Sequence, residues 1–559
     1  MQKKGLIVVA AFILLCAVVF GGIYVTRNFG KTQKIITQEN ASSQLDKLVK
    51  NIGARTVSHN KSAVDFVESE DVGEELPDIN TCAVNARATT PLYAEIFCSP
   101  EKAESGTDGW MVELANAFNK EGFKVDGKQV SVQIRDVTSG QAMDYITSGK
   151  AVPDGFSPSN SLWVDMMNAK GIATETILDK TVGNVAGIVL DENNYKAVID
   201  KYGSVDLKAV VEATESGDFV MGYTNPFSSS TGLNFLVSAL LRYDNANPLS
   251  EEALKGFGQF QANIPFVAFN TQQMLTATDN GSFNGFIMEY QSFVNKPTMV
   301  NYHFVPFGYR HDNPLVALES AGENEKEILR LFGEYISTDE AKALAEKYGF
   351  NGHDDYVSEQ KEINGSTLLE IQKVYKKNKD SGKAVVAVFV CDTSGSMDGA
   401  PLSALKDSLV NSLKYINENN YIGMVSYAND VSIDLPIGKF NLNQQALYKG
   451  AIEELRASGQ TATFDAIAVA MGMINDFMKD NPDVKPMIFV LSDGETNAGH
   501  SLGDIDGILT ALKYPVYTIG YNANLEALKK ISDINEAASI NASTDNVIYQ
   551  LKMLFNASM

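Results

Sequence analysis

The sequence predicts an α/β protein with two folded parts, a two-lobed domain and then a doubly wound, mainly parallel sheet, behind an apolar N-terminal helix. The chain has 559 residues, too many for one hydrophobic core. Between about Thr90 and Gly352, short apolar strands alternate with amphipathic helices, the pattern of an α/β domain. After about Ala384, uninterrupted apolar runs alternate with amphipathic helices, as in a sheet buried on both faces.

The composition is acidic and poor in cysteine. Lys plus Arg number 46 and Asp plus Glu number 69, which gives a net charge of −23. Nucleic-acid binders carry basic patches, so this balance argues against a nucleic-acid partner. The four cysteines form no CxxC and the five histidines are scattered, which gives no support to a Cys/His zinc site. Cys82 and Cys98 could form a disulfide outside the cytoplasm, or could pack as two small buried side chains.

The stretch from Gly5 to Tyr24 carries no charge and has the length of a membrane-spanning helix. A cleaved signal peptide has a shorter apolar core, and no small-residue cleavage site follows here. A lipoprotein signal would need a small residue before its cysteine, whereas Leu15 precedes Cys16. We expect residues 1–27 to form a cytoplasmic head and an uncleaved single-pass anchor. The bulk of the chain would then be extracellular, because long domains translocate largely regardless of flanking charge.

Four further segments follow the anchor. Residues 28–88 are polar and predict a stalk with one or two short helices, or a disordered linker. Residues 89–360 form the two-lobed domain. Residues 361–383 contain NGSTLLEIQKVYKKNKD, which predicts a helical connector with Ser366 as its cap and basic residues at its negative end. Residues 384–559 form the doubly wound domain.

Hydroxyl and carboxylate side chains stand at the carboxyl ends of strands in this last domain. The strand AVVAVFV runs directly into CDTSGSM, and PMIFVLS runs into SDGETN. In a doubly wound sheet these strand ends form the binding rim. The loop GQTATFDAI enters a helix at the same rim. Such oxygen atoms suit Mg²⁺, a hard cation that prefers octahedral geometry and keeps several waters.

This arrangement resembles the von Willebrand factor A family over residues 384–559. The family's metal-ion-dependent adhesion motif is D-x-S-x-S, then a threonine, then an aspartate, and this chain has them in order as Asp392, Ser394, Ser396, Thr461 and Asp493. The resemblance implies that Mg²⁺ or Mn²⁺ binds there and takes an Asp or Glu from a protein partner at an open position. The three hydroxyls would be direct or near-direct ligands, and the two carboxylates would orient bound waters. We also expect the first aspartate to be an exposed loop residue, so that Asp392→Ala would abolish metal binding and spare the fold.

Residues from about 90 to 352 resemble, more loosely, the extracellular solute-binding proteins that capture small oxyanions. The similar stretches are EIFCSPEKA, DVTSGQA, PDGFSPSNSLW and GYTNPFSSSTGLNFL. The resemblance implies a periplasmic-binding-protein-like (type II) fold that closes on its ligand with hydroxyls and helix starts, which bind anions through free N–H groups. The candidate ligand-binding residues are Ser99, Ser139, Ser159, Ser229 and Thr231. Alternatively these residues only cap helices, and the domain keeps the fold without a solute.

No enzyme is expected. GHSLG matches the G-x-S-x-G elbow of serine hydrolases, but no strand directly precedes Ser501 and no histidine follows His500. A P-loop motif is absent from the sequence. The order of anchor, solute-binding-like domain and von Willebrand domain resembles Gram-positive bacterial surface proteins. The sequence thus predicts a membrane-anchored extracellular binding or adhesion protein. The alternative is a cytoplasmic assembly module that partners an ATPase in a chelatase-like complex.

Overall fold

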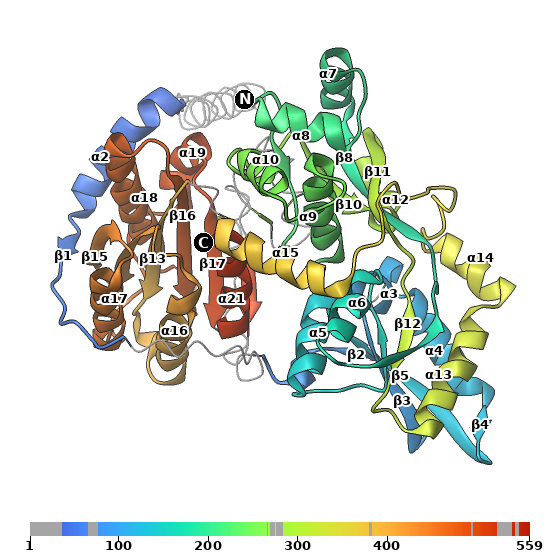
Figure 1. The fold of residues 1–559 in the computed structure, drawn as a ribbon. Coiled ribbons are helices and arrows are strands. Elements are labelled where there is room, and N and C mark those ends of the chain that lie inside the picture. Colours follow the sequence, from blue (N-terminus) through green and yellow to red (C-terminus); the bar gives the residue numbers. More distant parts are fainter. Residues whose placement is uncertain are drawn as a thin grey trace, which may run out of the picture.

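The computed structural model of the protein describes residues 36–64, 76–104, 106–264, 267–268, 274, 283–379, 383–493, 496–521, 539–542 and 547–559. Within these residues the chain forms two α/β units, and the helix α15 lies between them (Figure 1). The predicted anchor, Gly5–Tyr24, lies outside them. None of the described helices is long and apolar enough to cross a membrane.

The C-terminal unit is built on a mixed, mainly parallel sheet with the strand order β1-β15-β14-β13-β16-β17-β18. Its strands are β1 (Arg55–Thr56), β13 (Val385–Asp392), β14 (Tyr421–Tyr427), β15 (Val431–Lys439), β16 (Lys485–Ser492), β17 (Val516–Tyr521) and β18 (Ser539–Ala542). The central strand β13 runs parallel to both β14 and β16, whereas β15 runs antiparallel to β14. The carboxyl ends of β13 and β16 therefore meet at one rim.

Helices cover both faces of this sheet. One face carries α16 (Ala400–Ser412), α17 (Leu442–Glu454) and α21 (Val547–Ser558), and the other carries α2 (Gln38–Ile52), α18 (Thr463–Asp480) and α19 (Leu502–Leu512). Side chains of β13 alternate between the two cores: Phe389 packs with the first group, whereas Val388 and Val390 pack with the second. Because successive side chains of a strand point to opposite faces, burial of both faces explains the uninterrupted apolar run.

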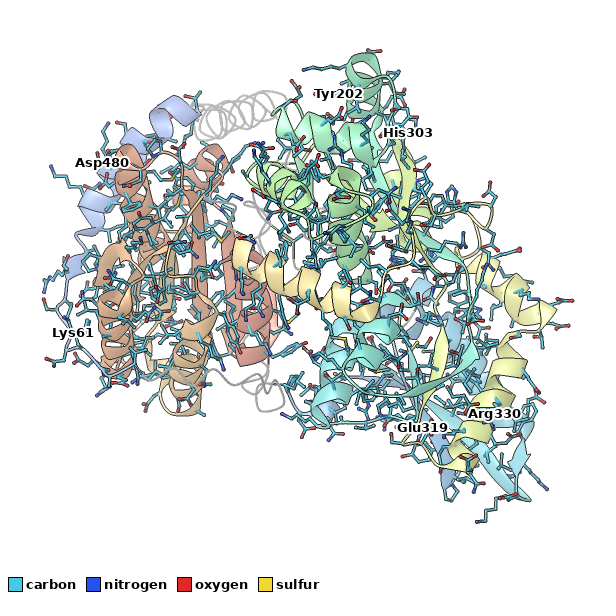
Figure 2. All side chains as sticks on the ribbon, viewed as in Figure 1. Lys61, Tyr202, His303, Glu319, Arg330 and Asp480 are labelled. Carbon is cyan, nitrogen blue, oxygen red and sulfur yellow. The ribbon has the colours of Figure 1, made fainter. Side chains whose placement is uncertain are left out.

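Part of the expected stalk belongs to this unit. Residues 36–64 lie along its outer flank, where Figure 2 shows Lys61 at the edge of the molecule. Leu45 of α2 is fully buried in the core with α18, and a Cβ on Gly472 would lie 2.9 Å from Cγ2 of Val49. The sequence analysis missed this packing because the segment is mostly polar. Its single apolar stripe is nevertheless enough to bury one face of a helix.

The segment after α2 is fixed to the edge of the sheet. The short strand β1 pairs in parallel with β15, and His59 follows it. The Nε2 atom of His59 lies 3.0 Å from Oδ1 of Asp434, and its Nδ1 lies 2.8 Å from Oε2 of Glu454. The hydrogen bond from His59 lowers the pKa of the Glu454 carboxyl. Gly450 of α17 has no side chain where the Asn60 carbonyl passes, and a Cβ there would lie 1.7 Å from that oxygen.

The middle unit has two lobes, as the sequence predicts. The first lobe's strands are β2 (Val84–Ala86), β3 (Leu92–Cys98), β4 (Lys124–Val125), β5 (Lys128–Asp136), β6 (Gly155–Ser157), β7 (Thr174–Leu178) and β12 (Leu315–Leu318). The second lobe's strands are β8 (Asn184–Asp191), β9 (Met221–Gly222), β10 (Gly285–Glu289) and β11 (Tyr302–His311). The chain passes into the second lobe between β7 and β8 and returns between β11 and β12.

Helices pack on each of these sheets. The first lobe contains α3 (Pro100–Ala103), α4 (Trp110–Glu121), α5 (Ser139–Ser148), α6 (Leu162–Ala169), α13 (Glu323–Ile336) and α14 (Asp339–Lys347). The second contains α7 (Glu192–Tyr202), α8 (Leu207–Glu215), α9 (Ser230–Tyr243), α10 (Glu251–Gln261) and α12 (Tyr290–Val294). Figure 2 shows Glu319 and Arg330 at the outer side of the first lobe, and Tyr202 and His303 at that of the second.

The connector is α15 (Gly365–Asn378), which packs against α6 and crosses towards the C-terminal unit (Figure 1). The expected cap, Ser366, is not the residue that begins it. Asn364 does so instead: its Oδ1 accepts a hydrogen bond from the Thr367 backbone N–H at 2.9 Å. Asparagine is as good a cap as serine, so the sequence located the helix correctly and misplaced its first turn.

Cys82 and Cys98 are both free in the structure. Cys98 is buried on β3, and its thiol contacts the sulfur of Met111 at 3.4 Å. Burial raises the pKa of the Cys98 thiol to about 12, so this cysteine is an inert core side chain.

The packing of α2 predicts that a substitution far from the C-terminal sequence destabilises the C-terminal domain. Leu45→Ala removes a fully buried side chain and should lower that domain's free energy of unfolding by roughly 2–5 kcal/mol. Hydrogen exchange at the amides of β13 and β16 measures this locally. Lys47→Ala, on the exposed face of α2, is the matched control. Unchanged protection in Leu45→Ala would contradict the shared core.

Candidate functional site

The five predicted metal-site residues come from three loops at the carboxyl rim of the C-terminal sheet. Asp392 ends β13 and Asp493 directly follows β16, and parallel pairing of Cys391 with Leu491 brings these two strand ends side by side. Thr461 lies two residues before α18. The backbone N–H of Gly395 donates to the carbonyl of Gly459 at 3.0 Å, which ties the first loop to the one that carries Thr461.

A chain of hydrogen bonds connects the hydroxyls with one carboxylate. The Oγ atoms of Ser394 and Ser396 lie 3.2 Å apart, and the Ser396 hydroxyl donates to Oδ1 of Asp493 at 2.9 Å. Ser394 is buried, whereas Ser396 is exposed. The site is therefore open to solvent on the side of Ser396.

Asp392 is completely buried, which corrects the expectation of an exposed loop carboxylate. Its Oδ1 accepts from the Ser394 backbone N–H at 2.8 Å, and its Oδ2 accepts from the Ser492 hydroxyl at 2.5 Å. Burial raises the pKa of the Asp392 carboxyl; the hydrogen bonds from Ser394 and Ser492 act against this, and the nearby charge of Asp493 adds to it. Asp392→Ala would thus leave two buried donors without their acceptor, so the substitution affects the fold as well as the site.

Thr461 is held by the segment that follows Asp493. Its backbone N–H donates to Oδ1 of Asn497 at 2.9 Å, and its carbonyl accepts from the Thr496 hydroxyl at 2.8 Å. The sequence argument missed these supporting residues, and it missed Ser492. All three stand in the motif SDGETN, where their short polar side chains were the available signal.

The residues present fit a hard divalent cation. Three hydroxyls and two carboxylates supply oxygen atoms only, and Mg²⁺ prefers oxygen ligands. Across the part of the chain that the structure describes, no cluster of three or more His, Cys, Asp or Glu could hold a metal. That finding fits this site, because two of its five residues are acidic and the rest are hydroxyl-bearing.

Ser501 begins α19 and is not a nucleophile in a hydrolase elbow. Its backbone N–H donates to Oδ2 of Asp504 at 2.8 Å as part of a capping box, and its hydroxyl also donates to that oxygen at 2.6 Å. The neighbouring His500 directs Nδ1 at Oδ1 of Asp465, 2.6 Å away. The serine therefore serves as a helix cap.

A cavity of about 500 Å³ lies between the two lobes of the middle domain. Four of the five predicted solute-binding residues line it: Ser139, Ser159, Ser229 and Thr231. The fifth, Ser99, is buried behind the wall, where Lys102 donates to its hydroxyl. The sequence thus predicted residues that the fold does bring together.

Three of the predicted hydroxyls in this cleft already have partners. Ser229 caps α9, accepting from the Gly232 N–H at 3.2 Å, so the capping alternative describes this residue correctly. The Ser139 hydroxyl accepts from the Ser159 N–H at 3.3 Å. The Thr231 hydroxyl donates to Oε1 of Glu289 at 3.1 Å.

Carboxylates are the functional residues that the sequence argument missed in the cleft. Glu101, Glu104, Asp108 and Glu289 line it, with Lys296 as the basic side chain among the lining residues. Burial raises the pKa values of Glu104 and Asp108, and neighbouring acidic charges add to this. The hydrogen bond from Gln291 acts in the opposite direction on the pKa of Asp108. The pKa of Asp136, at the end of β5, is raised to about 7 by burial and then by the charges of Glu104, Glu101 and Asp108. Several acidic side chains therefore lie close together on the first-lobe side of the cleft.

The C-terminal domain supplies a third side of the cleft. Tyr549, Gln550 and Met553 of α21 line the cavity beside the two lobes. The Asn225 amide, just before α9, donates to the carbonyl of Met553 at 2.9 Å. The cleft is therefore shared between the two domains.

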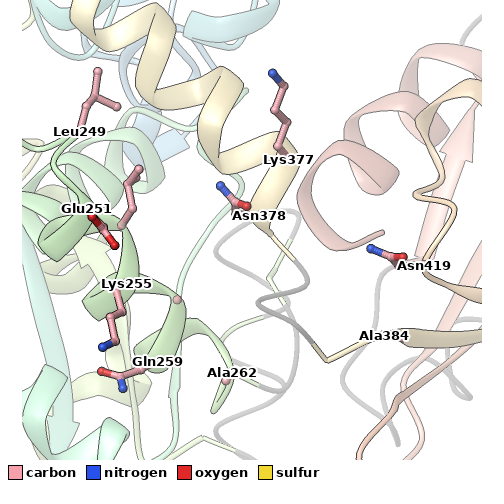
Figure 3. Close-up of a pocket in the computed structure, with 11 residues that line it drawn as sticks. Leu249, Glu251, Lys255, Gln259, Ala262, Lys377, Asn378, Ala384 and Asn419 are labelled. Atoms are coloured by element: carbon pink, nitrogen blue, oxygen red, sulfur yellow. The ribbon is translucent and has the colours of Figure 1, made fainter.

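A second cavity, of about 910 Å³, lies at the junction of α10, α15 and the start of β13 (Figure 3). Figure 3 shows Glu251, Lys255 and Gln259 of α10 on one side, and Lys377 and Asn378 of α15 nearby. None of the predicted solute-binding residues lines it.

Two protein families match the chain in succession. Bacterial extracellular solute-binding proteins match residues 103–351, and the von Willebrand factor type A domain matches residues 387–553. Inter-alpha-trypsin inhibitor heavy chain H3 of Bos taurus is 26% identical over 149 residues, which are 25% of this chain and 16% of that protein. An uncharacterized protein of Synechocystis sp. is 28% identical over 135 residues, 24% of this chain and 31% of its own length. The chain thus covers less than a third of either relative.

Solved structures resemble each part separately. A periplasmic thiamin binding protein is 9% identical with a TM-score of 0.38, covering 51% of this chain and 95% of that chain. A von Willebrand factor type A protein from Catenulispora acidiphila is 18% identical with a TM-score of 0.28, covering 31% and 42%. The family matches identify this chain as a bacterial-type extracellular solute-binding domain followed by a von Willebrand factor type A domain.

Proposed function

We propose that the C-terminal domain binds Mg²⁺ or Mn²⁺ and, through the ion, an acidic group of a protein partner. The observation that carries this is the hydrogen-bonded chain Ser394–Ser396–Asp493 at the open rim, beside the buried carboxylate of Asp392. A bound ion would supply a positive charge with a coordination position for the partner's carboxylate. The hydroxyls of Ser394, Ser396 and Thr461 would hold the ion in this proposal.

The two carboxylates have different roles in this proposal. Both oxygens of Asp392 already accept hydrogen bonds, from the Ser394 N–H and the Ser492 hydroxyl. This supports an indirect role, in which Asp392 supplies negative charge and positions Ser394. Asp493 is partly exposed and bonded to Ser396, so it can orient waters on the ion.

We also infer that the middle domain binds a small solute in the cleft between its lobes, and that a segment before α2 tethers the chain to the outer face of a cell membrane. The lobed architecture, the cavity of about 500 Å³ and the family match support solute binding. The uncharged run from Gly5 to Tyr24 supports the tether. Domains of both families typically act as binding modules, which supports a binding function for this protein.

Metal binding is expected to depend on exposed rim residues whose loss spares the fold. Ser396→Ala and Asp493→Asn should each weaken Mg²⁺ binding by roughly tenfold or more, because each removes a ligand or a water-orienting group. Calorimetric titration of Mg²⁺ into the full chain measures this. Asp480→Asn removes an exposed charge at the end of α18 opposite to Thr461 and should bind Mg²⁺ as the wild type does.

Binding of the protein partner should depend on the metal and on the same rim residues. Pull-down from membranes should lose its partner on EDTA treatment and in Ser396→Ala, and Ser501→Ala should retain it. Equal Mg²⁺ heats from wild type, Ser396→Ala and Asp493→Asn would refute the metal site.

The location is tested by protease added to intact cells. We expect loss of an epitope in the C-terminal domain, because the proposed tether leaves both domains outside. Protection in intact cells that disappears on lysis would overturn this and would favour a cytoplasmic assembly module that partners an ATPase.

Acidic crowding beside the cleft predicts a pH-dependent stability. Asp136 has a folded pKa of about 7 against an ordinary value of 3.8, so its ionisation opposes folding. This cost is absent below about pH 4, grows as the pH rises and is complete above about pH 7. Asp136→Asn should therefore stabilise the middle domain at pH 8 by roughly 2–4 kcal/mol and have little effect at pH 4. Urea unfolding at both values checks this, and an equal effect at both would contradict it.

A further inference from the structure

The cleft between the lobes has a strongly asymmetric charge. Glu101, Glu104 and Asp108 approach it from the first lobe, and Glu289 approaches from the second. Lobe closure would bring these carboxylates around one enclosed ligand. An oxyanion in that position would face four acidic side chains at close range, and such repulsion is strong where water is excluded.

The basic side chains nearby do not reverse this balance. Lys102 is fully buried behind the wall and donates to Oδ1 of Asn313 at 2.9 Å and to the Ser157 carbonyl at 3.0 Å. Its Nζ also lies 3.3 Å from Oε1 of Glu101, which offsets one carboxylate. His311 contacts Glu289 at 2.9 Å. Lys296 is the basic group on the cavity surface, and its charge acts on Asp108 more weakly than burial does.

The size and spacing of the site argue against a bare metal ion. The cavity of about 500 Å³ is many times the space of one water molecule, about 30 Å³. In the described parts of the chain, no three acidic or histidine side chains stand close enough together to hold one ion. The carboxylates are instead distributed over opposite walls, which suits a molecule with separated charges.

We propose that the solute is a small organic cation with two or more ammonium groups joined by an alkyl chain. This inference rests on the proposed solute-binding function and names the ligand class. Glu104 and Asp108 would hold one ammonium group, and Glu289 would hold another across the cleft. The hydroxyl of Ser228 can accept a further N–H group, and the side chains of Tyr549 and Met553 from α21 offer apolar surface to the alkyl chain.

Two further observations agree with a cationic ligand. Burial raises the pKa values of Glu104 and Asp108 and nearby acidic charges add to this, whereas the hydrogen bond from Gln291 lowers the pKa of Asp108. A bound cation would relieve the acidic repulsion. The lining hydroxyls that an oxyanion would need as donors are partly committed elsewhere. Thr231 already donates to Glu289.

The test uses the full chain in metal-free buffer, so that the rim site does not contribute. Calorimetric titration compares putrescine and spermidine with 1,4-butanediol, the uncharged analogue of putrescine, and with molybdate, sulfate and phosphate. We expect binding of at least one amine and none of the diol. Glu104→Gln combined with Asp108→Asn should weaken amine binding tenfold or more. The substitution Asp108→Asn keeps a side-chain oxygen that can accept the 2.9 Å hydrogen bond from the Gln291 amide.

Glu340→Gln, an exposed substitution on α14, is the control for the loss of one acidic charge and should leave amine binding unchanged. A thermal melt of each variant establishes that it is folded. Binding of an oxyanion without any amine would overturn the cationic ligand and keep the solute-binding function. Amine binding that the cleft variants leave unchanged would also overturn the proposal. If neither amines nor oxyanions bind, both the cationic ligand and the proposed solute-binding function are contradicted.

Discussion

The parallel pairing of β13 with β16 is the constraint on which the rim site depends. Register fixes Cys391 beside Leu491, so the residues that follow each strand must emerge together at one edge. One of these, Asp392, is buried and occupied by two hydrogen bonds, which holds the loop that follows it. The exposed hydroxyl of Ser396 then reaches Asp493 from the neighbouring strand. The open side of the site is thus supported by a buried carboxylate whose two oxygens both accept hydrogen bonds.

The sequence predicted those parts of the fold that local patterns determine. Apolar runs gave the buried strands of the C-terminal sheet, and alternation gave the lobes of the middle domain. Four of the five predicted rim residues, Asp392, Ser394, Ser396 and Asp493, lie at or just after strand ends, and Thr461 lies in the loop that enters α18. Burial of Asp392 was missed because it depends on the Ser492 hydroxyl, a contact across two strands that spacing alone does not show.

Long-range packing was the part that the sequence could not supply. The segment around Leu45 looks polar, and its place in the C-terminal core is determined by α18, hundreds of residues later. The carboxylates of the cleft were missed for a similar reason: Glu104, Asp108 and Glu289 come from separate segments, and only folding brings them to one cavity. The predicted hydroxyls line one cavity, but hydroxyls and helix starts carry no information on its charge.

The attachment of residues 36–64 to the C-terminal domain determines how mechanical load would travel through the protein. In sequence, the C-terminal domain has parts on both sides of the middle domain. The elements α2 and β1 come before the middle domain, and the other strands of the sheet come after it. A force applied between the start of α2 and the rim at Asp392 would be transmitted through α2, α18 and the sheet. His59 adds contacts to Asp434 of β15 and to Glu454 of α17. The two-lobed domain lies outside this path. The two lobes could therefore open and close on a solute without bearing this tension. A force at the rim would not pass through the segments that connect the lobes.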